Sequence, residues 1–324
     1  MTNYSHQSTL FGSLAKANEP LAPYTTYKIG GPADIFLEVK TKDAMVQALQ
    51  IAKKNDIPWF VLGGGTNILI ADKGVRGLVI KNSIDEIVIR GMKGVMKNGA
   101  SEKIVFVEVG SGVAMNKLVR YTIEEGLQGL EMHLGLPGSV GGAVYMNSKW
   151  MKPKGFVGDV VYQAEILHPN GQTEAVGQSY FRFGYGESFI QKSKDIVLSV
   201  TFALKKADKD TLWSVANESI IHRKTTQPAG KTAGCMFKNI SEMEALTRST
   251  PNQSTSAGFL IDKAGGKSLS VGDAGISPLH ANFFMNNGKA TASDMVQLVA
   301  SVKEKVKHAY GVELKEEVQM IGEF

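Results

Sequence analysis

The chain has a single cysteine and no long apolar run, and these absences exclude disulfide-bonded and membrane-spanning classes of protein. Cys235 is the single cysteine among 324 residues, which excludes an internal disulfide and fits a reducing, cytoplasmic location. No stretch approaches the roughly 18 apolar residues of a membrane-spanning helix, and residues 1–10 lack the order of a signal peptide. The six histidines show no paired spacing, so no metal site is expected. We expect a cytoplasmic globular protein without a membrane segment or a metal.

Positively charged side chains are in modest excess over negatively charged ones. The formal net charge is +5, and the lysines are dispersed among acidic residues. Such an excess helps to attract anionic ligands such as nucleotides. No basic helix or aromatic platform accompanies it, so a nucleic-acid partner is not expected.

Glycine, in contrast, is locally dense in two segments. Residues 135–147 read GLPGSVGGAVYMN, and GGGTN at 63–67 directly follows the apolar run 57–62. Glycines allow close approach to the main chain, and bare amide groups can hold a diphosphate. A tight turn is the alternative for either loop alone, whereas the two together favour a dinucleotide gripped from two sides. Gly135 and Gly138 are three apart, which does not match the GxGxxG of a Rossmann turn.

Apolar periodicity predicts a mixed α+β chain with a boundary near residue 207. Helical spacing covers four segments: 41–54, 114–125, 211–222 and 292–310. Strands are predicted at 57–62, 105–109, 195–204 and, by alternation, 312–324, with a hairpin at Asn170-Gly171. The stretch from 223 to 282 is expected to be rich in loops. The pattern indicates an N-terminal α+β cofactor unit and a C-terminal α/β substrate unit.

Seven short segments, taken in order, carry a resemblance to a known family. They are TYKIGGPA (26–33), GGGTN (63–67), GLPGSVGGAVYMN (135–147), FGY (183–185), AGCMFKN (233–239), HANFFMN (280–286) and Glu317-Val318 followed by Ile321-Gly322. With these segments the chain, from about residue 21 to 324, resembles the UDP-N-acetylenolpyruvoylglucosamine reductase (MurB) family. Members are flavoenzymes of peptidoglycan precursor synthesis.

The resemblance implies a domain plan and a cofactor. An N-terminal extension (1–22) precedes a two-lobed, PCMH-type FAD-binding unit (23–206, lobes about 23–85 and 86–206). A smaller α/β substrate-binding domain (207–324) follows, with a returning tail (312–324). FAD is expected to bind non-covalently, with NADPH as co-substrate. The residues implied to hold FAD are Ile29, Gly30, Gly31, Pro32, Gly63, Gly64, Gly65, Thr66, Asn67, Gly135, Pro137, Gly138, Gly141, Gly142, Ala143 and Asn147.

The implied activity is that of UDP-N-acetylmuramate dehydrogenase, which reduces UDP-N-acetylglucosamine enolpyruvate to UDP-N-acetylmuramate. The enzyme is expected to be a monomer. Cys235 aligns with the serine acid usual in the family, and a thiol, with a reference pKa near 8.5, is a stronger acid than a hydroxyl. Its alternative interpretation is a small buried hydrophobe. Glu317 aligns with the family's catalytic glutamate, and a carboxylate on a strand surface is the alternative.

The chain departs from the family pattern at two charged positions. Gly186 stands where most members carry an arginine that steadies the substrate carboxylate, and Gln319 replaces a basic residue. On an alternating strand Arg182 would share the face of Gly186 but lie about 13 Å away along the strand, so it could substitute only through a local irregularity, with an ordinary surface arginine as the alternative. Lys238 is the stronger candidate for a nearby cation.

Two further positions and one segment belong to the same prediction. Tyr185 is expected to form a hydrogen bond with the substrate phosphates, and Asn239 is expected to be a further substrate-binding residue. Residues 148–156 depart from the usual Asn-Ala-Gly continuation without an assigned role. Because of these departures, a catalytically impaired paralogue that still binds FAD or the UDP-sugar is the alternative function. Another FAD oxidoreductase sharing the cofactor domain is a third possibility.

Overall fold

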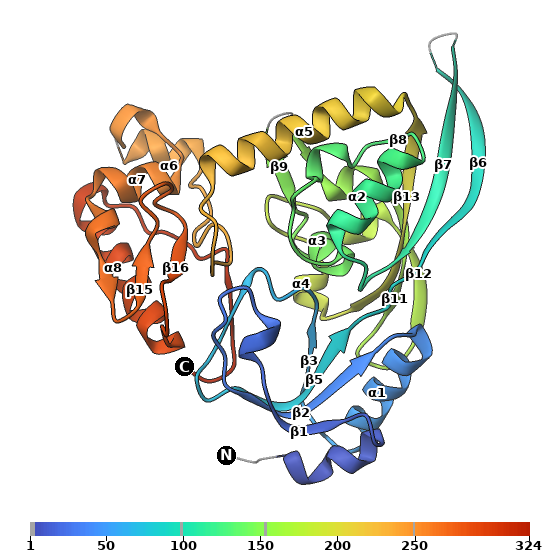
Figure 1. Ribbon diagram of the computed structural model, residues 1–324, viewed down its shortest axis with the longest axis horizontal. Helices are drawn as coiled ribbons and strands as arrows, with labels where there is room; N and C mark the ends of the chain where they lie inside the picture. Colours follow the sequence, from blue (N-terminus) through green and yellow to red (C-terminus); the bar gives the residue numbers. More distant parts are fainter. Residues whose placement is uncertain (1–3, 98–99, 152–153, 249) are drawn as a thin grey trace.

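The computed structural model describes residues 4–97, 100–151, 154–248 and 250–324. Three parts meet near the middle of the molecule (Figure 1): a first lobe drawn in blue, a second in green and a C-terminal part in orange. None of the helices in the described residues is both long and apolar enough to cross a membrane. Strands and helices are mixed throughout, which confirms the predicted α+β class.

The first lobe is built on a four-stranded sheet whose two central strands are largely buried on both faces. Its strands, in spatial order, are β1 (Lys16–Pro20), β2 (Pro32–Val39), β5 (Val75–Asn82) and β3 (Trp59–Leu62). The pairs β2–β5 and β5–β3 are parallel, and β1 is antiparallel to β2. One face packs against α1 (Lys42–Lys54), where Thr41 caps the helix as the sequence predicts. Parallel strands read as apolar runs because both faces are covered.

The second lobe is an antiparallel sheet covered by helices. Its strands, in spatial order, are β12 (Thr173–Gly177), β11 (Val161–Leu167), β13 (Ile196–Lys206), β7 (Ala100–Gly110) and β6 (Ile87–Lys97), with β8 (Leu127–Gln128) beside β13. The long β6–β7 hairpin extends away from the body (Figure 1). The helices of this lobe are α2 (Met115–Glu124), α3 (Val140–Tyr145) and α4 (Ile190–Ser193). Between α3 and β11 lies a small hairpin of β9 (Lys149–Met151) and β10 (Lys154–Phe156).

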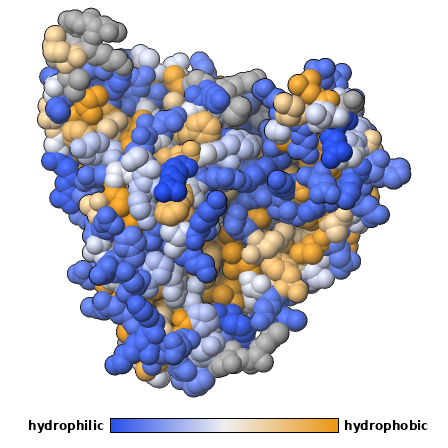
Figure 2. Space-filling view, turned by 180° about the vertical axis from the view of Figure 1, so that it is seen from behind, coloured by the Kyte–Doolittle hydropathy of each residue, from blue (hydrophilic) through white to orange (hydrophobic). Residues whose placement is uncertain are grey.

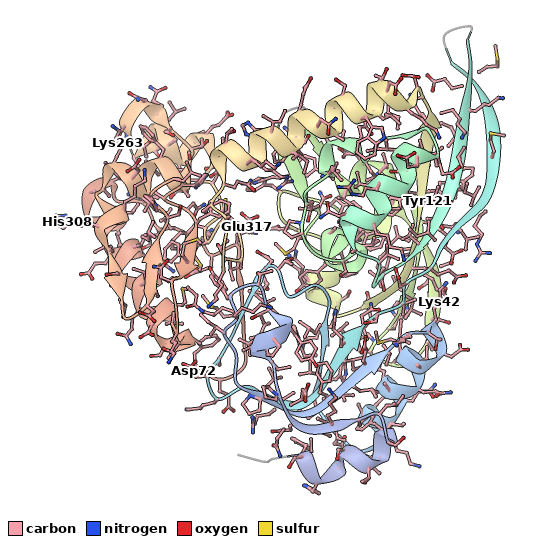
Figure 3. The ribbon with its side chains drawn as sticks, viewed as in Figure 1. Lys42, Asp72, Tyr121, Lys263, His308 and Glu317 are labelled. Carbon is pink, nitrogen blue, oxygen red and sulfur yellow. The ribbon has the colours of Figure 1, made fainter. Side chains whose placement is uncertain are left out.

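The two lobes are joined by polar and apolar contacts. Lys42 Nζ, at the start of α1, donates to Glu108 Oε1 at 2.8 Å, Glu165 Oε2 at 2.6 Å and Ser199 Oγ at 2.8 Å, all on strands of the second sheet. Figure 3 shows Lys42 at this junction. Leu167 and Leu198 extend the core of the first lobe into the second. Apart from this junction, each lobe keeps a hydrophobic core of its own.

The C-terminal part has its own core around a long helix. Its helices are α5 (Lys209–Thr226), α6 (Glu242–Thr247), α7 (Ala257–Lys263) and α8 (Ala292–Tyr310). Its antiparallel sheet consists of β14 (Ser270–Val271), β15 (Ala274–Ile276) and β16 (Phe284–Asn286). Buried residues of α5, such as Leu212 and Ala216, belong to the core of the second lobe, whereas α7 and α8 pack on this sheet. The predicted domain boundary near 207 thus precedes a helix that packs backward onto the second lobe.

The end of the chain returns to the first lobe. Strand β17 (Gln319–Ile321) pairs in parallel with β4 (Ile68–Ile70), which directly follows the first glycine loop. The predicted strand over 312–324 is wrong in extent, since only three residues form a ladder. Val312, Leu314 and Val318 are buried, so the alternation records burial against the C-terminal core without a neighbouring strand along most of its length.

Other sequence-based predictions can be compared directly. Helix α8 has the predicted limits, and the hairpin at Asn170-Gly171 joins β11 to β12. The stretch 223–282 is rich in loops, as predicted, and within it lie the end of α5, α6, α7, β14 and β15. The helices α6 and α7 and the strands β14 and β15 are two to seven residues long, too short to show a clear period. Short 3-10 helices lie in the connections: η1 (Ser5–Phe11), η2 (Ala22–Tyr24), η3 (Glu131–His133), η4 (Val157–Val160), η5 (Gln178–Phe181), η6 (Pro251–Gln253) and η7 (Gly266–Ser268).

Candidate active site

A cavity of about 1500 Å³ lies where the three parts meet. Both glycine loops line it, together with β9, the loop at 185–186 and the C-terminal segments around Cys235 and Glu317. Figure 3 shows Glu317 near the centre of the molecule, between the C-terminal part and the two lobes. The face seen in Figure 2 is mostly hydrophilic, with an apolar patch below its centre. Both glycine loops and Cys235, the predicted acid, line this same cavity.

The two glycine loops touch each other through their backbones. A Cβ on Gly64 would lie 2.5 Å from the Cα of Gly138, and one on Gly63 would lie 2.6 Å from Ser139 Oγ. Lys81 Nζ fixes the first loop by donating to the carbonyl of Gly63 at 2.6 Å. Glycine is required here because any side chain would separate the loops.

The second loop leads into a helix start that suits an anion. Ser139 caps α3, its Oγ accepting from the amide of Gly142 at 3.4 Å. Gly141 and Gly142 lie in the first turn, and Gly142 is exposed in the cavity wall. Main-chain amides and a positive helix end favour a phosphate group. Gly63–Asn67 and the cavity-lining part of 135–147 thus have the form that the diphosphate of FAD needs.

The segment Ile29–Pro32 lies elsewhere, unlike the expectation from the resemblance. None of its residues lines the cavity. The amide of Gly31 donates to Ala71 O at 2.9 Å, and a Cβ on Gly31 would lie 2.1 Å from Asp72 O. The glycines of this segment serve close packing against the loop after β4.

Cys235 and Glu317 are brought together by main-chain pairing. The amide of Glu317 donates to Met236 O at 2.7 Å, and Cys235 forms a bridge with Phe283 on its other side. Asn67 Nδ2, from the first glycine loop, donates to Glu317 O at 3.0 Å. Residues more than 80 positions apart in the chain are therefore fixed beside the first glycine loop. Gln319 also lines the cavity, with its amide bonded to Asn67 O at 2.9 Å.

Burial and charge keep the proton on the Cys235 sulfur. Desolvation first, and then the negative charge of Glu317, raise the pKa of the Cys235 thiol to about 12. The positive charge of Lys149 and a hydrogen bond with Asn282 act in the opposite direction. Desolvation likewise raises the pKa of Glu317, against the charges of Lys149 and Lys238. At neutral pH Cys235 is therefore a protonated thiol, suited to donate a proton.

Asn147 connects the end of the second glycine loop to the loop that carries Tyr185. Its Nδ2 donates to Gly184 O at 2.9 Å, and its Oδ1 accepts from the amide of Gly158 at 3.0 Å. Tyr185 lines the cavity, and Gly186 follows with φ +64°. Through these bonds Asn147 places Tyr185 at the cavity wall.

The remaining predicted substrate residues divide into two groups. Asn239 lines the cavity, and its Oδ1 accepts from Ala257 N at 3.2 Å. Lys238 is bound to Glu187 at 2.9 Å and does not line the cavity, although its Nζ lies 3.9 Å from the Cβ position of Gly186. Its charge still reaches Glu317.

Arg182 is not brought to the cavity. It ends η5 in a left-handed conformation, and its guanidinium carbon lies 4.7 Å from the centre of the Phe189 ring. Residues 182–186 form a turn and not a regular strand, but this irregularity does not bring Arg182 to the cavity that Gly186 lines.

Two basic residues that the sequence argument left out line the cavity near the site. Lys149 Nζ lies 3.4 Å from the centre of the Tyr185 ring, and Arg223 lies 4.1 Å from that of Trp150. The departure of residues 148–156 from the family pattern was the one signal for Lys149. Within the described ranges, no cluster of three or more His, Cys, Asp or Glu side chains could hold a metal ion.

Comparison with known proteins agrees with this arrangement. Residues 226–321 match the C-terminal domain of UDP-N-acetylenolpyruvoylglucosamine reductase, and residues 33–177 match an FAD binding domain. The UDP-N-acetylenolpyruvoylglucosamine reductase of Anoxybacillus flavithermus is 36% identical over 311 residues, covering 95% of this chain and 94% of the relative. That of Bacillus subtilis is 35% identical over 310 residues, covering 94% and 93%.

Solved structures extend the comparison to the fold. The crystal structure of UDP-N-acetylenolpyruvylglucosamine reductase (MurB) from Thermus caldophilus has a TM-score of 0.75 and 33% identity, covering 93% of this chain and 97% of the other. A VAO-type flavoprotein of Myceliophthora thermophila shares the fold at a TM-score of 0.52 and 11% identity, over 86% of this chain and 70% of that one. The chain belongs to the UDP-N-acetylenolpyruvoylglucosamine reductase family.

Proposed function

We propose that this protein reduces UDP-N-acetylglucosamine enolpyruvate to UDP-N-acetylmuramate in peptidoglycan precursor synthesis, using FAD as cofactor and NADPH as co-substrate. The observation that carries the proposal is the arrangement of Cys235 and Glu317. They face the same cavity as two glycine loops that touch through their backbones. The relatives named above bear the name of this activity.

The cofactor has a defined place in this proposal. Gly63–Asn67 and the cavity-lining residues of 135–147 hold FAD, with main-chain amides toward its diphosphate. When bound, FAD carries a hydride equivalent from NADPH to the enolpyruvyl double bond. Asn67 serves twice, since its side chain also fixes the main chain at Glu317.

The protein supplies the proton. Hydride addition to one alkene carbon leaves negative charge on the other carbon, delocalised into the carboxylate, and this carbon must receive a proton. Cys235 Sγ holds a proton at neutral pH, because burial and the charge of Glu317 raise the pKa of the thiol to about 12. Sulfur that has lost this proton is a strong base and takes another from solvent. Glu317 supports the acid by keeping it protonated before the reaction.

The substrate lies, in this proposal, between the C-terminal part and the second lobe. Tyr185 and Asn239 line the cavity on these two sides and contact the UDP-sugar. We further propose that the protein acts as a monomer. The single cysteine and the nucleotide substrates fit the cytoplasm.

Purification tests the proposal. The protein is expected to be yellow, or to become so on reconstitution with FAD, and to lose flavin absorbance with NADPH. Addition of the enolpyruvyl substrate is expected to restore the absorbance with formation of UDP-N-acetylmuramate. Protein that stays colourless after reconstitution would refute the proposal.

A further inference from the structure

The proposed reaction places a carboxylate beside Cys235, and that carboxylate needs a cation. Negative charge grows on it as the double bond is reduced, and a positive group aimed at this charge lowers the barrier. Where family members have an arginine, this chain has Gly186 with φ +64°. The charge must therefore come from another residue of this chain.

Four basic side chains line the cavity: Lys53, Lys149, Lys194 and Arg223. Lys149 is the one whose charge acts on both Cys235 and Glu317. The Lys53 side chain donates to Asn170 O, and neither Lys194 nor Arg223 is among the charges that shift the pKa of Cys235 or Glu317. Position and electrostatics thus single out Lys149.

Lys149 reaches this place from a different element than an arginine at 186 would. It begins β9, two residues after Asn147, and its Nζ lies 3.4 Å from the centre of the ring of Tyr185, the residue before Gly186. An aromatic face holds an ammonium group without neutralising it. Lys149 has no carboxylate partner within 4.0 Å in the described part of the chain.

Lys238, the cation that the sequence favours, differs on this point. Its Nζ is bound to Glu187 Oε1 at 2.9 Å, and the residue does not line the cavity. A charge already paired is less available to a substrate anion. Both lysines are half-buried, and they differ in that the Lys238 ammonium has a carboxylate partner whereas the Lys149 ammonium lies against an aromatic ring.

We propose that Lys149 Nζ binds the carboxylate of the enolpyruvyl group and so takes the place of the arginine missing at Gly186. This inference rests on the proposed function, because the carboxylate belongs to that substrate. Tyr185 serves as the platform that holds the ammonium group over the reacting carbon atoms. In this chain the positive charge therefore comes from the hairpin β9–β10, whereas an arginine at position 186 would supply it from the loop.

Binding of two ligands to the FAD-loaded, oxidised protein tests the role of Lys149. UDP-N-acetylmuramate carries the carboxylate and UDP-N-acetylglucosamine lacks it, so titration calorimetry with both isolates this contact. We expect Lys149→Gln to weaken UDP-N-acetylmuramate roughly 10- to 100-fold, the range of one hydrogen bond between charged groups. Binding of UDP-N-acetylglucosamine should change less than about twofold, within the scatter of uncoupled contacts.

Two variants control for charge and for folding. Lys154→Gln removes a lysine of the partner strand β10 that is exposed, and it should leave both affinities unchanged. Lys149→Arg keeps the charge and should retain the preference for UDP-N-acetylmuramate. Gly186→Arg in the Lys149→Gln background should restore part of that preference, because Cβ at 186 has only ordinary contacts, though its φ is unfavourable.

The results separate this inference from the function on which it rests. Lys149→Gln protein that loses both ligands equally, or neither, would overturn the role of Lys149 while the wild type still turns over. A preference lost in Lys149→Arg as well would also overturn it. Wild-type protein that binds neither ligand would refute the proposed function itself, and the role of Lys149 with it.

Discussion

At the residue scale, the thiol of Cys235 is the group on which the proposed chemistry depends. Its pKa of about 12 results from burial and from the charge of Glu317. Such a thiol is a poor nucleophile near neutral pH, since thiolate is the reactive form. The same property that makes it inert to alkylating reagents keeps its proton available to the substrate.

Replacement of Cys235 should affect one half of the catalytic cycle. Cys235→Ala removes the acid, so we expect restoration of flavin absorbance by the enolpyruvyl substrate to slow roughly 10²- to 10⁴-fold. Bleaching by NADPH should be unchanged. Stopped-flow absorbance under anaerobic conditions measures both steps, and Cys235→Ser is the matched control that keeps a proton donor. Equal slowing of both steps in Cys235→Ala would contradict the acid role.

His133 gives the chain a defined sensitivity to acid. It is fully buried, neither ring nitrogen has a hydrogen-bond partner among the described residues, and burial lowers its pKa to about 4 from 6.5. The unfolded chain binds a proton that the folded chain excludes between these values. Stability is therefore present above pH 6.5 and is lost as pH falls toward 4, by about 3 kcal/mol.

Urea unfolding at several pH values checks the role of His133. His133→Phe should flatten this part of the stability profile while leaving FAD content unchanged. His168 is a useful contrast, because Asp195, followed by Glu174, raises its pKa and its contribution is lost as pH rises. A profile of the same shape in His133→Phe would show that other groups cause the loss.

The sequence predicted some of the site residues but not the basic residues beside them. Cys235, Glu317, Tyr185 and Asn239 were named from short motifs, and all four line the cavity. The role of Lys149 is not predictable from the sequence, because the hairpin of β9 and β10 that brings it to Tyr185 lies in a segment that departs from the family pattern. Arg182 needs a local irregularity to reach the site, and the turn that the backbone makes there does not bring it to the cavity.

At the element scale, the glycine loops matter as a pair. Each is compatible with a tight turn on its own, and only their contact shows why both lack side chains. Long periodic elements such as α8 were predictable, since six buried positions define one face. The helices between residues 240 and 263 were not, because tertiary packing rather than a local period fixes segments of this length.

A methyl group at Gly64 should separate the two loops. The added Cβ would lie 2.5 Å from Gly138 Cα, so the backbone of one of the loops would have to move. We expect Gly64→Ala to weaken FAD binding roughly tenfold or more, about 1.4 kcal/mol. Fluorescence titration of the apoprotein with FAD measures this affinity. Gly177→Ala, where nothing lies within 4 Å of the added Cβ, is the control, and equal affinities in both variants would contradict the loop contact.

At the scale of the whole molecule, the active site exists only where all parts meet. The C-terminal part contributes Cys235 and Glu317, the first lobe one glycine loop and the second lobe the other. Parallel pairing of β17 with β4 fixes the junction beside the first glycine loop. The domain plan from the sequence stays a prediction, and the packing of α5 on the second lobe is what periodicity could not reveal.

Asp72 adds a polar contact across this junction. Its carboxylate oxygens accept from the amides of Ala292 at 2.8 Å and Ser293 at 3.0 Å, at the start of α8 (Figure 3). Asp72→Ala should cost about 1 kcal/mol in the free energy of unfolding, the usual loss of a helix cap. Thermal unfolding measures it, with exposed Lys73→Ala as control. An unchanged midpoint would show that Thr291 caps α8 sufficiently alone.

The most direct measurement for the whole account is a single anaerobic experiment on the FAD-loaded wild-type protein. NADPH is added first and UDP-N-acetylglucosamine enolpyruvate second, while flavin absorbance is followed and the product is analysed. The account predicts bleaching, then recovery with one UDP-N-acetylmuramate formed for each NADPH oxidised. Bleaching without recovery, or recovery without that product, would contradict it.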